Sequence, residues 1–119
     1  MPKYLISFDD GAMTFPEEDL PEVAEAARAV IAEAEEAGAV VVFAGGLPEH
    51  REASIVAVDG TISDGPFPDS RQYLGGFTIL EVPSREEALA WAAKIAVACR
   101  CAQEVREFLP EGRPELDPS

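Results

Sequence analysis

Basic residues are scarce in this chain of 119 residues. Nine lysines and arginines stand against 23 aspartates and glutamates, so the net charge is −14 at pH 7. A surface this negative repels phosphate groups. We therefore predict no direct binding of nucleic acid and no attachment to membranes, and we interpret the acidity as a source of solubility.

Histidine and cysteine are almost absent as well. One histidine and two cysteines do not make a zinc-ligand pattern, so we expect no metal site and no cofactor. Cys99 and Cys101 are a poor disulfide pair, because only one residue separates them, and should pack as small apolar side chains. No apolar run approaches the ~20 residues of a membrane helix, and the N-terminus lacks the layout of a signal peptide. We expect a cytoplasmic protein.

Strand and helix patterns alternate along the chain. Strands are predicted over residues 3–8, 40–44, 54–58, 61–63, 77–82 and 102–109. One helix should run from near Pro21, after a cap at Asp19, to Gly38, and a second should follow Ser84, which forms a capping box with Glu87. The Asp-Gly pair at 59–60 predicts a hairpin, and the run 40–44 is apolar enough to predict a buried strand rather than an edge strand.

Each predicted helix carries a single apolar stripe. The two stripes comprise Leu20, Val23, Ala27, Val30, Ala34 and Ala37, and Ala88, Trp91, Ala92, Ile95 and Cys99. Such helices pack on one face of an antiparallel sheet, so the predicted fold is α+β, a ferredoxin-like α/β sandwich with an added hairpin. The strands carry more apolar residues than one face can use, so we expect a homodimer that stacks sheet on sheet. Residues 1–109 should form the domain and 110–119 a solvated tail rich in proline and acid.

Residues 64–67 have the sequence DGPF, and residues 74–77 have the sequence LGGF. These motifs resemble the signature of the DGPF-domain branch of the YCII-related family, over residues 3–109. The resemblance implies the fold of the dimeric α/β-barrel superfamily. In the best-known YCII branch a histidine early in the first helix pairs with an aspartate after the second. Residues 21–24 and 94–98 supply neither, so we expect no chemistry that depends on that dyad.

The DGPF motif has a structural and a functional interpretation, and both stay open. In the structural one, Asp64 opens a turn, Gly65 takes a positive φ angle, and Phe67 anchors the loop in the core. In the functional one, the corner lines a cleft where Asp64 serves as acceptor or base.

Candidate catalytic residues are Asp64, His50 and Asp9. His50 is the only side chain that ordinarily titrates near neutral pH, which suits a general base. A histidine in a charged loop can also be simply exposed, and Asp9 is explained equally well by turn formation.

Candidate ligand-binding residues are Phe67, Arg71, Tyr73 and Tyr4. Arg71 could hold a carboxylate or phosphate with its two-pronged guanidinium group. Its alternative role is a salt bridge to one of the many acidic side chains.

Two functions follow as hypotheses. In the first, the protein is a small cytoplasmic homodimer that binds a small organic molecule in a cleft near the DGPF loop. Its enzyme version adds acid–base catalysis, and whether it is an enzyme stays open. In the alternative, it is a non-enzymatic accessory or sensory module. DGPF-domain proteins resemble partners of alternative sigma factors, so the resemblance implies such an association in transcription regulation.

Overall fold

A computed structural model describes residues 1–48, 50–68 and 73–110. Its strands are β1 (Lys3–Asp9), β2 (Val40–Gly46), β3 (Ser54–Val56), β4 (Ile62–Asp64), β5 (Leu74–Glu81) and β6 (Glu104–Glu107). Its helices are α1 (Leu20–Glu36) and α2 (Arg85–Cys99), with single 3-10 turns at Glu17–Asp19 and His50–Glu52.

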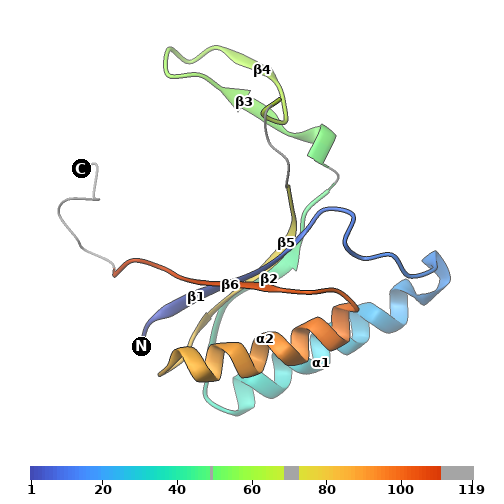
Figure 1. Cartoon of the computed structure of the whole chain (residues 1–119), viewed down its shortest axis with the longest axis vertical. Coiled ribbons are helices and arrows are strands. Elements are labelled where there is room, and N and C mark those ends of the chain that lie inside the picture. Colours follow the sequence, from blue (N-terminus) through green and yellow to red (C-terminus); the bar gives the residue numbers. More distant parts are fainter. Residues whose placement is uncertain (49, 69–72, 111–119) are drawn as a thin grey trace.

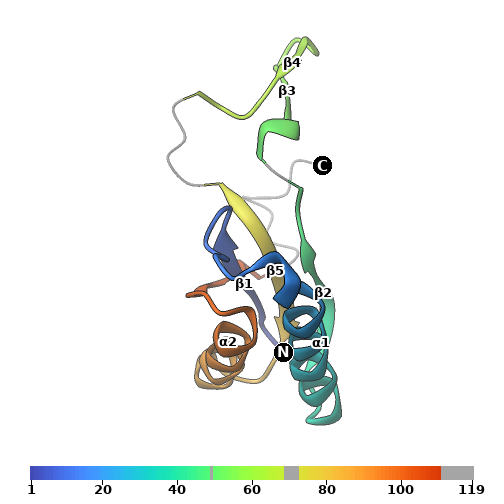
Figure 2. The same ribbon diagram turned by 90° about the vertical axis from the view of Figure 1, so that its right-hand side faces the viewer.

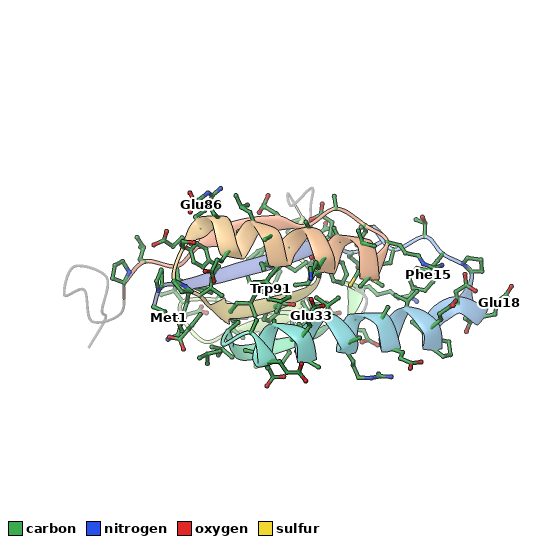
Figure 3. All side chains as sticks on the ribbon, turned by 90° about the horizontal axis from the view of Figure 1, so that it is seen from below. Met1, Phe15, Glu18, Glu33, Glu86 and Trp91 are labelled. Atoms are coloured by element: carbon green, nitrogen blue, oxygen red, sulfur yellow. The ribbon has the colours of Figure 1, made fainter. Side chains whose placement is uncertain are left out.

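The main sheet has the order β2-β5-β1-β6, and every neighbouring pair is antiparallel. Both helices lie side by side on one face of it (Figures 1 and 3). This arrangement confirms the predicted ferredoxin-like α/β sandwich with helices on a single face. Among the described residues the sheet does not close into a barrel.

The core lies between the sheet and the helices. Tyr4, Ile6, Leu80 and Val82 are fully buried there, and Ala88, Ala92, Ile95 and Cys99 of α2 complete the cluster. The predicted stripe of α2 is therefore confirmed. Because small residues dominate it, this helix can approach the sheet closely.

Local signals place three of the helix ends well, but the predicted cap at Asp19 is wrong, because its side chain makes no capping hydrogen bond. Ser84 Oγ accepts a hydrogen bond from the Glu87 amide at 3.2 Å, as the capping box predicts. Gly38 adopts φ +98°, which ends α1 in the left-handed conformation expected of it. The apolar stripe of α1 is right in its middle but wrong at its ends. Leu20 is 52% exposed because the first turn of α1 extends past the end of α2 (Figure 3).

The prediction of a buried strand over residues 40–44 is wrong for the single chain. β2 is an edge strand, and Val42 and Phe43 are half exposed. The register shifts between Val41 and Phe43, so the apolar run divides between the two faces of the sheet. Phe43 then lies on the helix-free face, with its ring centroid 4.9 Å from that of Phe77.

We call the helix-free side of the main sheet the open face. The directly paired residues Leu5 and Ile79 lie on it, because their neighbours Ile6 and Leu80 point into the core. It also carries Lys3, Val42, Phe43, Phe77 and Glu81. No part of the described chain forms a second layer over this face (Figure 1).

The predicted hairpin is confirmed as β3 and β4, with strands shorter than expected. We call residues 53–65 the arm. It projects beyond one end of the main sheet in both views (Figures 1 and 2) and bends toward the open-face side in Figure 1. Its strands pack chiefly on each other. Gly60 takes φ +89° at the tip, and Asp59 accepts a hydrogen bond from the Thr61 amide at 2.9 Å.

Candidate functional site

The DGPF motif lies at the base of the arm. Asp64 is the last residue of β4 and pairs with Ser54. The next amide, that of Gly65, donates a hydrogen bond to the carbonyl oxygen of Ala53 at 2.8 Å. The motif therefore ends the hairpin by joining its two strands at their root.

Two structural predictions for this motif are wrong. Gly65 does not adopt a positive φ angle. It is required for space instead, because a Cβ atom there would lie 3.0 Å from both the Cβ and the carbonyl oxygen of Ala53. Phe67 is 64% exposed and does not anchor the loop in the core of the chain.

The proposed catalytic residues occupy neighbouring regions at one end of the molecule. Asp64 is exposed at the arm base, and His50 begins the 3-10 turn that precedes β3. Asp9 is exposed at the end of β1, where it pairs with Leu74 at the start of β5. The His50 side chain lies outside the described residues, and a general-base role for any of the three remains a prediction.

The proposed ligand-binding residues are spread more widely. Phe67 follows the arm base, and the Tyr73 carbonyl accepts a hydrogen bond from the Asp10 amide at 2.6 Å, beside Asp9. Arg71 lies outside the described residues. Tyr4 is only 2% exposed and belongs to the core.

Tyr4 has a distinct electrostatic environment. Burial raises the pKa of its phenol, and the negative charge of Glu107 raises it further. Glu107 pairs with Tyr4 across β1 and β6, which brings the two side chains together. This phenol is therefore held in its neutral form and can donate a hydrogen bond to the carboxylate.

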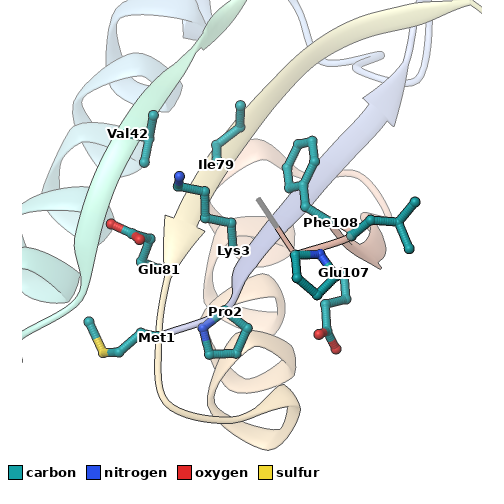
Figure 4. Close-up of a pocket in the computed structure, with 10 residues that line it drawn as sticks. Met1, Pro2, Lys3, Val42, Ile79, Glu81, Glu107 and Phe108 are labelled. Carbon is teal, nitrogen blue, oxygen red and sulfur yellow. The ribbon is translucent and has the colours of Figure 1, made fainter. Parts of the chain in front are cut away.

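A groove of about 580 Å³ lies on the open face beside the first residues of the chain (Figure 4), at the end of the sheet opposite the arm (Figure 1). It is lined by residues from both ends of the chain and from the sheet: Met1, Pro2, Lys3, Val42, Ile79, Glu81, Glu107, Phe108, Leu109 and Pro110. Its walls are mostly apolar, and Lys3 projects between Val42, Ile79 and Phe108 with Glu81 nearby (Figure 4). Such a mixture suits an organic molecule with an apolar body and one polar group.

Sequence reasoning missed this groove. Residues far apart in the sequence build it, and Pro110 had been assigned to the solvated tail. The available signal was the apolar pair Phe108–Leu109 directly after the last strand, since a solvated segment gains nothing from such residues.

The described residues contain no cluster of three or more histidine, cysteine or acidic side chains that could hold a metal ion. Cys99 and Cys101 are free thiols, and burial raises the pKa of each. Both therefore resist ionisation and pack as apolar residues. Among these residues, no helix is both long and apolar enough to cross a membrane.

Comparison with family models finds the YCII-related domain over residues 5–110. A comparison with curated proteins finds no match. The matched segment includes both helices, the strands β2 to β6 with the whole arm, and all of β1 except its first two residues. On this match over nearly its full length, the chain belongs to the YCII-related domain family.

Proposed function

We propose that this protein binds a small organic molecule and acts as a cytoplasmic homodimer. The observation that carries the proposal is the groove on a sheet face that no helix covers. Apolar side chains left in water cost free energy, and a ligand or a second copy that buries them recovers it.

The ligand class follows from the groove lining. Val42, Ile79 and Phe108 offer apolar contact, and the Lys3 ammonium group can donate hydrogen bonds to a carbonyl oxygen. The Glu81 carboxylate disfavours an additional negative charge. A neutral aromatic or carbonyl compound fits this combination best.

The homodimer would form by stacking two open faces. Phe43 and Phe77 form an aromatic pair on this face, and Val42 is half exposed there. Sheets pack face to face about 10 Å apart, which suits these side chains. Because each copy carries a charge of −14, the dimer should tighten as salt screens the repulsion.

A more specific version of the proposal adds acid–base catalysis to ligand binding. Asp64, His50 and Asp9 lie at the arm end of the sheet, whereas the groove lies at the opposite end. Ligand binding in the groove therefore does not depend on these three residues within one chain.

Titration with the neutral fluorophore N-phenyl-1-naphthylamine tests the proposal. The native protein should enhance its fluorescence, and Val42→Lys should weaken binding at least about tenfold, since a buried charge is costly. Val97→Lys is the matched control, because Val97 is an 81% exposed valine on α2. No binding, or equal binding by both variants, would overturn the proposal and favour the sigma-factor-associated module.

A further inference from the structure

The arm exposes apolar side chains that the single chain does not use. Val56 is 66% exposed, Ile62 is 71% exposed, and Val58 at the tip is fully exposed. A lone two-stranded hairpin is at best marginally stable in water. The radius of gyration is 16.2 Å, against about 13.5 Å for a compact domain of this length. The arm therefore has the properties of a segment that docks on another surface.

Turn chemistry accounts for only part of the tip. Asp59 and Gly60 are explained by the side-chain hydrogen bond to Thr61 and by the positive φ angle. Val58 has no such role, because a β-branched apolar residue contributes nothing to a solvated turn. Turn formation therefore leaves the exposed Val58 without a role.

One hydrogen bond closes the root of the arm, and another closes the end of the sheet beside it. The Gly65 amide bonds to Ala53, and the Leu47 amide donates to the Gly75 carbonyl at 2.8 Å. The second bond ties the strand that leads into the arm to the strand that follows it. A hairpin closed at its root loses less conformational entropy when it docks than an open loop of the same length.

The arm projects beyond one end of the sheet, whereas the N-terminus, whose residues Met1, Pro2 and Lys3 line the groove, lies at the other end (Figure 1). In a dimer with stacked open faces, the two-fold axis can lie between the sheets and perpendicular to the strands. Such an axis places the arm end of one copy over the groove end of the other. We propose that the arm of each copy closes over the groove of the other, with Val58 beside the partner copy's groove. This inference rests on the proposed function, because the groove is the ligand site, and it makes that site a product of two chains.

A second copy is the occupant that fits best. Both surfaces belong to one chain, and a two-fold interface requires such self-complementarity. A stable interface takes about 20–30 residues and about 800 Å² per partner, which the open face and the 13-residue arm (residues 53–65) together can supply. The arm is acidic through Asp59 and Asp64, and the groove holds Glu81 beside Lys3, so docking should tighten as salt screens these charges.

Disulfide trapping tests the arrangement. In a Cys99→Ala, Cys101→Ser background, one protein carries Val58→Cys and another carries Leu109→Cys, which lies in the groove and is 59% exposed. After mixing and mild oxidation we expect a covalent product of about 25 kDa, twice the 12.7 kDa of one chain. The matched control replaces Leu109→Cys with Val97→Cys on α2 and should yield at least about tenfold less.

Equal yields from the two pairs, or no product although sedimentation shows a dimer, would overturn the arm docking. Should the cysteine background fail to fold, Val58→Lys and Val97→Lys in the native protein replace it. Only Val58→Lys should then raise the dimer dissociation constant, at least about tenfold, and equal constants would overturn the inference.

The fluorophore titration separates this inference from the proposed function. Trapping without fluorophore binding would leave the arm docking standing and remove the ligand site. Fluorophore binding that Val42→Lys weakens, with no disulfide trapping, would keep the ligand site and overturn the arm docking.

Discussion

The Gly65 amide donates to the carbonyl oxygen of Ala53 across 2.8 Å, and this bond closes the root of the arm. The two residues are so close that a side chain at position 65 would contact both the backbone and the Cβ atom of Ala53. Gly65, the second residue of the DGPF motif, thus leaves room for the close approach of the two strands. The motif determines where the arm ends.

Gly65→Ala should open the root of the arm. The added Cβ atom would lie 3.0 Å from Ala53, and relieving that contact should cost the arm about 1–3 kcal/mol. Amide hydrogen exchange in β3 and β4 should become faster, while α2 keeps its protection because the arm unfolds locally. Gly46→Ala is the control, since its nearest contact is at 3.7 Å. Unchanged exchange in the arm would contradict this reading of the motif.

Asp64→Asn should behave differently. Asp64 is exposed, and asparagine keeps its size and much of its hydrogen bonding, so stability should change by less than about 1 kcal/mol. Thermal melts check this. A loss of stability comparable to that of Gly65→Ala would mean that the carboxylate stabilises the arm root. A functional role would then not be required to explain Asp64.

Gly76→Ala should damage the core sheet itself. A Cβ atom at this position would lie 2.6 Å from the Phe8 ring and 2.9 Å from the Gly45 carbonyl oxygen on the neighbouring strand. Neither β1 nor β2 can move without breaking its pairing with β5, so we expect a loss of about 2–3 kcal/mol in urea denaturation. Gly46→Ala should again stay within about 0.5 kcal/mol. Equal midpoints for the two variants would refute the steric argument.

Arg100 joins the end of α2 to the start of α1. Its guanidinium group lies 2.9 Å from Asp19 and 3.6 Å from Glu22, and its backbone adopts φ +59°. The side chain is 43% exposed, so after solvent screening Arg100→Ala should cost only about 1 kcal/mol. Arg100→Gly loses the same contacts but relieves a left-handed backbone strain of similar size, so it should be nearly neutral. Urea midpoints that coincide for both variants would show that the backbone angle carries no strain.

Tyr4 should make stability sensitive to alkaline pH. Burial and then Glu107 raise the pKa of its phenol in the folded protein. The folded state therefore holds this proton more tightly than the unfolded chain. Its contribution is complete below the unfolded pKa of ~10 and is lost as pH rises through the higher folded value. Tyr4→Phe should flatten the decline in stability above that pH, in denaturation curves recorded alongside the native protein. Parallel curves would show that the phenol does not contribute.

Local sequence patterns anticipated much of this architecture. The capping box at Ser84, the left-handed Gly38 and the Asp-Gly turn at 59–60 all took the predicted conformations. Each depends on residues within a few positions of one another, so their physics is present before the chain folds. The two apolar stripes then required a sheet with helices on one side.

Long-range packing decided the rest. Residues 40–44 became an edge strand because strand order depends on which segments meet, and no local pattern encodes that order. Gly65 is needed because Ala53 lies against it, and the groove exists because residues from both ends of the chain lie beside the sheet. Periodicity identifies which side chains seek burial. Which residues they pack against is determined only when segments distant in sequence come together. For the open face and the arm, we propose that a second copy of the chain completes the packing.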